Sequence, residues 1–282
     1  MRKCGERQHS ATGHGWRHRV NLVLKIPTRS WSGNAIGRCG NCAVRRTGVC
    51  GAVPEYRASE LAQIATDTVA RPGEAFIQEG GPADAFFNVS GGTARIYKLL
   101  SDGRRQIVGF AGAGHFLGLA SGAAYAFSAE AIDTVTYCRF PRSRFHALTD
   151  RVPSVEKIML HIATIELIAA QEQMVLLGRK TARERLASFL VARHMLSSGG
   201  LGLDRSFALP MSRSDIADYL GLSVETICRT FTRLRLEGLI EIVGISRIIV
   251  LDSLGLETLA EGVGYGLAPP EECGPRMRAG HG

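Results

Sequence analysis

The sequence contains no apolar run approaching the roughly 20 residues that a transmembrane helix requires. Its N-terminus also lacks the continuous hydrophobic stretch that is typical of a signal peptide. Acidic residues are scarce in the same region, because residues 1–38 contain eight Lys or Arg but only Glu6 as an acid. We therefore expect a soluble cytoplasmic protein with no membrane partner and with a basic, disordered extension over residues 1–38.

The chain has no recognisable nucleophile elbow, metal-hydrolase motif or phosphate-binding loop, so we expect no enzymatic activity. Its seven cysteines are an odd number, and cytosolic proteins rarely carry a disulfide framework. Metal binding or redox chemistry explains these cysteines better. With 282 residues and 45% hydrophobic composition, the chain is long enough for two domains with buried cores.

Residues 211–229, MSRSDIADYLGLSVETICR, have the pattern of a helix-turn-helix. Ser212 and Asp215 form a predicted capping box at the start of the first helix. Gly221 permits the tight turn, and Ser223 offers the cap of the second helix. An ordinary buried helical hairpin is the alternative interpretation, but the caps, the turn and the polar outer face all favour double-stranded DNA as the partner.

The outer face of the second helix carries side chains that suit the major groove. A glutamate accepts a hydrogen bond from a base amino group, and an arginine binds O6 and N7 of guanine, each contact contributing roughly 1–3 kcal/mol of discrimination. The residues that we expect at the DNA are Arg213, Ser223, Glu225, Cys228, Arg229 and Thr232. Cys228 is either an inert substitution or a thiol switch beside the DNA.

The rest of the chain divides by pattern into a β-rich part and a helical part. Short β-like runs with regular glycines extend from about residue 61 to residue 145 and predict a β-roll. Apolar residues then recur at spacings of four and three, which predicts a long dimerisation helix. The predicted seam of this helix consists of Ile158, Ile162, Ile165, Ala169, Glu172 and Leu176.

Glu172 is unusual within that seam. In a parallel twofold dimer it faces its own symmetry mate, and like charges there disfavour pairing. The alternative is that the helix rotates and exposes Glu172 to solvent. On the first interpretation, dimerisation is weak enough to be switched.

The spacing of three cysteines suggests a metal site. Cys39, Cys42 and Cys50 form a C-x2-C-x7-C pattern, and Cys138 ends a later strand-like run. Four thiolates suit an iron-sulfur cluster. On spacing alone, a cluster, zinc and free thiols all remain open.

The order of β-roll, long helix and winged helix-turn-helix resembles the CRP/FNR superfamily of bacterial transcription regulators over about residues 50–260, and the FNR branch in particular. The resemblance rests on the SRSDIADYLGLSVETICR motif, on TARERLASFL at residues 181–190, and on the cysteines. It implies an α+β chain with an N-terminal antiparallel, cyclic-nucleotide-binding-like β-roll. The implied divisions are an extension at 1–38, a sensor domain at 39–152, a dimerisation helix at 153–178, a winged helix-turn-helix domain at 179–265 and a tail at 266–282.

The resemblance also implies a cofactor and partners. FNR-type oxygen sensors hold an oxygen-labile 4Fe-4S cluster that favours the DNA-binding dimer, and the matching ligands here are Cys39, Cys42, Cys50 and Cys138. Glu225 and Arg229 match the residues that read TTGAT and ATCAA half-sites, whereas Cys228 stands where serine is common. RNA polymerase is the further partner implied.

Cyclic nucleotide is not expected as a ligand. Phe116 and Phe127 stand where nucleotide-binding members carry a carboxylate and a guanidinium, and a buried phosphate needs a charged or hydrogen-bonding partner. We therefore predict an oxygen-responsive regulator that binds inverted repeats as a homodimer when the cluster is present. The alternative is a regulator of the same fold that is metal-independent or thiol-redox controlled, with zinc or no metal at the cysteines.

Overall fold

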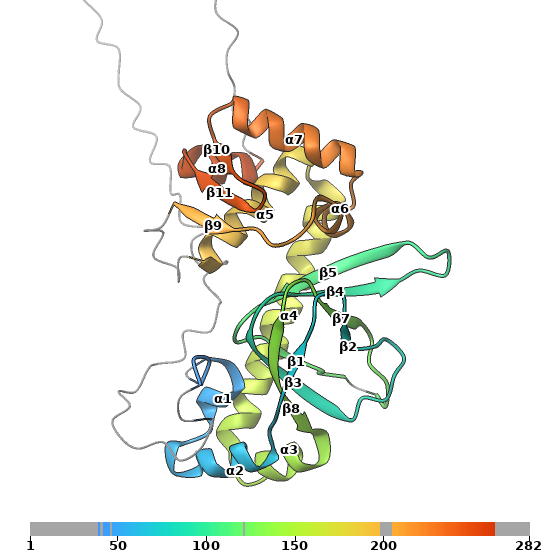
Figure 1. The fold of residues 1–282 in the computed structure, drawn as a ribbon, viewed down its shortest axis with the longest axis vertical. Helices are drawn as coiled ribbons and strands as arrows, with labels where there is room; N and C mark the ends of the chain where they lie inside the picture. The colour runs from blue at the N-terminus through green and yellow to red at the C-terminus, as the bar shows by residue number, and fades with distance from the viewer. Residues whose placement is uncertain (1–38, 40–41, 46, 121, 198–204, 263–282) are drawn as a thin grey trace, which may run out of the picture.

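The structure is a computed structural model that describes residues 39, 42–45, 47–120, 122–197 and 205–262. The predictions for residues 1–38 and 266–282 and for the glycine linker at residues 199–200 lie outside the described residues. Within the described part, a β-roll lies at one end, a smaller helical domain lies at the other, and one long helix runs between them (Figure 1).

The β-roll is made of two four-stranded antiparallel sheets, in the orders β1-β8-β3-β6 and β2-β7-β4-β5. The strands are β1 (Thr66–Ala70), β2 (Ala75–Ile77), β3 (Ala85–Gly91), β4 (Ala94–Leu99), β5 (Arg105–Ala111), β6 (Phe116–Leu117), β7 (Ser128–Ala131) and β8 (Val135–Pro141). The flanking helices are α1 (Gly48–Ala52), the 3-10 turn η1 (Glu55–Arg57), α2 (Ala58–Ile64) and α3 (Arg142–Thr149). This arrangement confirms the predicted α+β fold class.

Aromatic side chains fill the interior between the two sheets. Phe76 stacks on Tyr137 with ring centroids 4.7 Å apart, and Phe87 meets both Phe76 and Tyr137. Phe127 packs against this core. Phe116 belongs to a second core, where it stacks on Phe86.

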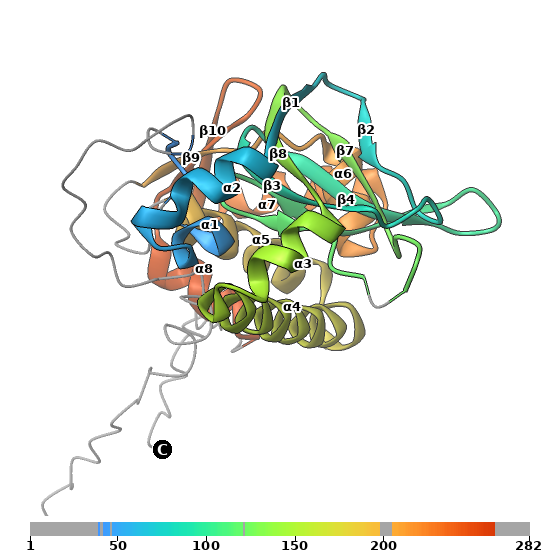
Figure 2. The same cartoon turned by 90° about the horizontal axis from the view of Figure 1, so that it is seen from below.

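Helix α4 (Pro153–Arg179) follows the β-roll and is apolar on more than one face. By length and composition it is long and apolar enough to cross a membrane, which corrects the sequence-based statement that no run approaches that length. One stripe, with Val155, Ile162 and Leu176, is buried against the chain itself. Figure 2 shows α4 at the edge of the molecule with the β-roll on one side of it.

Part of the predicted dimer seam on α4 is buried within the single chain. Ile162 and Leu176 are buried within the single chain, and Ile158 packs against the second core. The exposed apolar stripe is instead Leu160, Ala163, Leu167, Ala170 and Met174, which recur at spacings of three and four. In this heptad, Ile158, Ile165 and Glu172 occupy positions opposite the stripe. The predicted weakening of the seam by Glu172 therefore loses its basis.

The C-terminal domain contains α5 (Ala182–Ser197), α6 (Arg213–Leu220), α7 (Val224–Leu236), α8 (Ser253–Ala260), β9 (Ser206–Ala208), β10 (Ile240–Val243) and β11 (Arg247–Val250). Ser212 and Asp215 form the capping box of α6, and Gly221 ends that helix in the left-handed conformation with φ 61°. Ser223 caps α7 by accepting from the Thr226 backbone N–H. The helix-turn-helix and its β10-β11 wing are thus confirmed.

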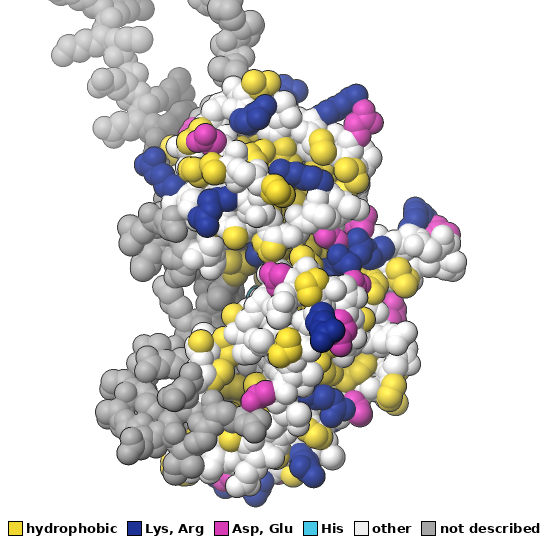
Figure 3. Space-filling model, in the orientation of Figure 1, with side chains coloured by type: hydrophobic (Ala, Val, Ile, Leu, Met, Phe, Trp, Pro, Cys, Tyr) yellow, Lys and Arg dark blue, Asp and Glu magenta, His cyan; other side chains and the backbone are white. Residues whose placement is uncertain are grey.

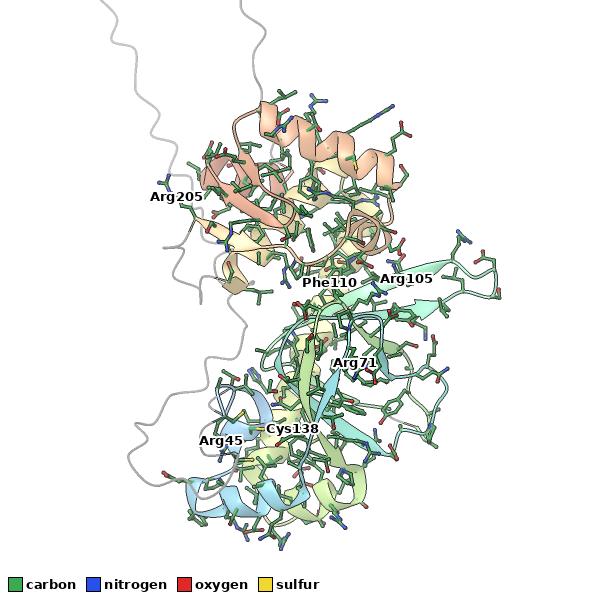
Figure 4. All side chains as sticks on the ribbon, viewed as in Figure 1. Arg45, Arg71, Arg105, Phe110, Cys138 and Arg205 are labelled. Carbon is green, nitrogen blue, oxygen red and sulfur yellow. The ribbon has the colours of Figure 1, made fainter. Side chains whose placement is uncertain are left out.

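The two domains touch through strand β5 and helix α6. Arg105 donates to the Asp218 carboxylate at 2.8 Å, and the Phe110 ring lies 5.3 Å from the Tyr219 ring. Figure 4 shows the labelled Arg105 and Phe110 at this junction. The β-roll is therefore in direct contact with the first helix of the helix-turn-helix.

Candidate cluster site and DNA-reading surface

A row of three side chains crosses the sheet beside the cysteine loop. Cys138 on β8 pairs with Asp67 on β1 in one direction and with Asn88 on β3 in the other. Residues that pair directly across neighbouring strands place their side chains on the same face. The register therefore presents Asp67, Cys138 and Asn88 side by side on one surface.

The cysteine loop approaches this surface closely at a glycine. Gly48 begins α1 with φ +62°, and a Cβ there would lie 2.8 Å from the Gly114 carbonyl oxygen. Only glycine fits this combination of left-handed backbone and close contact. Gly48 thus brings Cys50, two residues later, down onto the β-roll.

All four predicted ligands line one cavity of about 280 Å³. Cys39, Cys42 and Cys50 come from the loop and α1, and Cys138 comes from the sheet row. Figure 4 labels Arg45 and Cys138, which lie on neighbouring segments where the loop meets the sheet. The cysteine pattern at residues 39–50 and a strand almost 90 residues later therefore border the same cavity.

Groups at the cavity shift the pKa values of its thiols in opposite directions. Burial raises the pKa of the Cys50 thiol to about 12, while the guanidinium of Arg45 acts in the opposite direction. Burial also raises the pKa of Cys138, and Asp67 adds to that shift because the thiol donates to its carboxylate at 3.4 Å. Both thiols are therefore protonated near neutral pH without a metal, and a metal must displace their protons.

Among the described residues, no three His, Cys, Asp or Glu side chains converge closely enough to hold a single metal ion. Four thiolates on one zinc ion all lie about 2.3 Å from the same centre. In a 4Fe-4S cluster each thiolate binds a different iron, so the sulfur atoms surround a larger volume. Four cysteines around one cavity are donors that either an iron-sulfur cluster or a zinc ion can use.

Sequence reasoning missed the polar residues of the same cavity. Arg45, Asp67 and Asn88 line it together with the cysteines. Asp67 and Asn88 lie in strand runs that are far from any cysteine in sequence, and only the register of β1, β8 and β3 brings them to Cys138. Arg45 could have been identified from the sequence, since it lies three residues after Cys42 inside the cysteine pattern.

Helix α1 links the cysteine cavity to the long helix. Val49, Cys50 and Val53 belong to the same buried core as Val155 and Ile162 of α4. The Ser154 hydroxyl also donates to the Ala52 carbonyl at 2.8 Å. The segment that carries Cys50 is therefore packed directly on α4.

The outer face of α7 presents the predicted DNA-reading residues. Glu225 and Arg229 form an ion pair at 2.6 Å and are 71% and 79% exposed. Cys228 is exposed beside them, and the Thr232 hydroxyl donates to the Cys228 carbonyl. These side chains are available to a partner, because pairing across one exposed helix turn is weak.

Two further residues that were predicted to contact DNA also make contacts within the protein. Ser223 caps α7, so its hydroxyl is already engaged. Arg213 lies over the Phe231 ring, with its guanidinium carbon 3.5 Å from the ring centroid, and burial lowers its pKa. Lys and Arg side chains are spread over the domain that carries α7 in Figure 3, and they give this domain the positive surface that DNA phosphates require.

Comparisons with known proteins agree with this architecture. A family model for the Crp-like helix-turn-helix domain matches residues 184–259, and one for the cyclic nucleotide-binding domain matches residues 68–152. The chain is 43% identical over 238 residues to the transcriptional activatory protein AadR of Rhodopseudomonas palustris, covering 84% of this chain and 98% of AadR.

Two further similar proteins are matched over most of their own length. The nitrogen fixation regulation protein FixK of Bradyrhizobium diazoefficiens is 41% identical over 224 residues, which is 79% of this chain and 93% of FixK. The solved structure of FixK2 from Bradyrhizobium japonicum matches with a TM-score of 0.65 and 37% identity, covering 70% of this chain and 97% of that one.

Proposed function

The chain belongs to the CRP/FNR family of DNA-binding transcription regulators, and we propose that it activates transcription in response to oxygen through a 4Fe-4S cluster. The observation that carries the proposal is that four cysteines line one cavity: Cys39, Cys42, Cys50 and Cys138. When bound, the cluster supplies an oxygen-labile cross-link between the cysteine loop and the sheet.

The residues around the cavity couple this cross-link to helix α4. Cys138 anchors one side on β8, in the middle of a sheet, whereas Cys50 lies on the short helix α1. Because Val49 and Val53 pack on α4, fixing Cys50 also fixes the contact between α1 and the N-terminal half of α4. Release of the loop thus loosens one side of α4.

The opposite side of α4 fits a second copy of the chain. Leu160, Leu167 and Met174 are 70%, 59% and 65% exposed and lie seven residues apart, with Ala163 and Ala170 between them. Such a heptad buries its apolar residues by pairing with another helix. The homodimer of this proposal uses this stripe, and the face of α4 that packs on the β-roll remains within each chain.

In such a dimer, α7 of each copy enters the major groove of one half-site of an inverted repeat. Glu225 and Arg229 read bases there, and Arg213 and Thr232 contact the sugar-phosphate backbone of the DNA nearby. Cys228, on the same face, stands where a hydroxyl is common in FNR-type proteins. RNA polymerase is the further partner of the proposed cytoplasmic activator.

A cyclic nucleotide is not part of the proposal, although the β-roll matches a cyclic nucleotide-binding domain. The aromatic rings of Phe76, Phe87 and Tyr137 pack against one another between the sheets. Apolar packing of this kind offers no partner for a buried phosphate.

The test is the absorption spectrum and the iron and sulfide content of the full-length protein purified without oxygen. The proposal predicts a brown protein with about four irons per chain, as the cysteine donor set requires, and bleaching on exposure to air. A colourless protein that still binds DNA contradicts it and supports the alternative of zinc, or of thiol control at Cys228.

A further inference from the structure

Two buried polar side chains lie at the cysteine cavity without belonging to the set of ligands. Arg45 is 3% exposed and Asn88 is 1% exposed, and both line the cavity. Both therefore adjoin the four thiols, and neither is one of the predicted ligands.

Asn88 connects the two sides of the site. Its Nδ2 donates to Cys50 Sγ at 3.6 Å, while its backbone pairs with Cys138 on β8. Its Oδ1 is buried and has no hydrogen-bond partner in the described part of the chain. Asn88 therefore commits its donor group to a ligand sulfur and leaves its acceptor unused, an arrangement typical of functional sites.

Arg45 is the one cationic side chain among the described residues that line the cavity. Its Nη2 donates to the Val53 carbonyl at 2.7 Å, which ties the guanidinium to the C-terminal end of α1, the helix that carries Cys50. An arginine keeps its charge at all physiological pH values. It therefore provides a permanent positive charge beside thiols that must become thiolates on binding iron.

We propose that Arg45 and Asn88 are positioning residues of the cluster site. Arg45 offsets the negative charge of four bound thiolates, and Asn88 orients Cys50 through an N–H···S hydrogen bond. Groups that surround metal ligands in this way set the stability and the potential of iron-sulfur centres. The inference rests on the proposed function, because without a cluster neither residue has this role.

The experiment uses full-length protein in which the cluster is assembled without oxygen from iron and sulfide. The measured quantity is the rate at which a chelator removes iron, followed by the loss of visible absorption. For Arg45→Met and Asn88→Leu we expect release to accelerate by about 10- to 100-fold, the usual effect of losing such a partner. Arg45→Lys, which keeps the charge, should recover part of the loss.

Matched controls separate this role from folding. Arg104→Met removes an exposed arginine in the β4-β5 turn, whose partner is Asp102, and should release iron at the wild-type rate. Thermal unfolding of the metal-free variants reports whether the β-roll is intact. If Arg45→Lys releases iron as fast as Arg45→Met, and both melt lower without metal, Arg45 serves the fold and its proposed charge role is wrong.

The remaining outcomes are also decisive. If the wild-type protein assembles a cluster, and Arg45→Met and Asn88→Leu release iron at the wild-type rate, the inference is wrong while the proposed function stands. If the wild-type protein itself takes up no iron and sulfide, the proposed function fails and this inference fails with it.

Discussion

The carboxylate of Asp215 joins helix α6 to Arg95 on strand β4. Its Oδ1 accepts from Arg95 Nη1 and from Arg105 Nη2, each at 3.0 Å. Its Oδ2 accepts from the backbone N and the hydroxyl of Ser212, at 3.1 and 2.7 Å. One carboxylate, 3% exposed, therefore both caps the first helix of the helix-turn-helix and binds the β-roll.

Removal of that charge should destabilise the protein. Asp215→Asn keeps the shape of the side chain but leaves Arg95 with Glu130 and Arg105 with Asp218 as their remaining carboxylate partners, so the expected cost is about 1–3 kcal/mol. Calorimetry of the full-length protein should show a clear fall in Tm. Asp102→Asn, in an exposed turn, is the control and should leave the Tm unchanged. Equal melting of both variants contradicts this assignment.

Serine replacements should separate the ligands from the other cysteine. Cys39→Ser, Cys42→Ser, Cys50→Ser and Cys138→Ser each remove a thiolate from the cavity, so the anaerobic protein should lose most of its visible absorption. Cys228→Ser should retain full iron content, because this residue lies on α7 in the other domain. A colourless Cys228 variant, or a brown Cys138 variant, contradicts the ligand set.

A pair of charge substitutions should identify the dimer face of α4. Leu167→Glu places a charge in the exposed apolar stripe and should shift the protein toward monomer in analytical ultracentrifugation. Ala169→Glu adds the same charge two residues away, outside the stripe, and should leave the dimer intact. Dissociation by Ala169→Glu but not by Leu167→Glu would restore the seam predicted from the sequence.

Arg229 should control sequence discrimination more than affinity. Arg229→Ala should reduce the preference for an inverted repeat over scrambled DNA by about 1–3 kcal/mol, because a bidentate contact to guanine is lost. Arg235→Ala, at the C-terminal end of the same helix, should change both affinities to the same extent. Fluorescence anisotropy at one fixed salt concentration measures both. An unchanged preference in Arg229→Ala argues against base contact.

His115 should make folding stability sensitive to mild acid. Burial lowers its pKa in the folded state, and Arg193 lowers it further, so the unfolded chain binds the proton more readily. Stability is therefore complete above about pH 6.5, the unfolded pKa, and falls below it by at most about 1.4 kcal/mol per pH unit. Urea unfolding between pH 7 and 5.5 should show a weaker dependence for His115→Gln. Identical slopes for the two proteins refute the assignment.

The helix-turn-helix was predictable because its signals are local. Ser212, Asp215, Gly221 and Ser223 act within four residues of their partners, and each appears in the structure in the role that the sequence indicates. The grouping of Cys138 with the cysteine loop was predicted for a different reason, since the family resemblance assigned these four residues together, and the structure places them around one cavity. Neither inference required the arrangement of the sheets.

The dimer seam was not predictable in this way. Helix α4 has apolar stripes on opposite faces, and periodicity identifies stripes without showing which neighbour covers each of them. Ile162 faces the β-roll of its own chain and Leu167 faces solvent, although both fit a heptad. In the same way, the contacts of Asn88 and Arg95 depend on strand register and domain contact, which the sequence does not encode locally.

The chain order of the four cysteines also sets a sequence of events during synthesis. Three of them emerge from the ribosome early, whereas Cys138 lies on β8, the last strand of the roll, which is inserted between β1 and β3. The complete donor set therefore exists only after the roll has closed. For the proposed cluster, insertion would follow translation of the whole sensor domain, since a chain stalled before residue 138 contains only three of the four proposed ligand thiols.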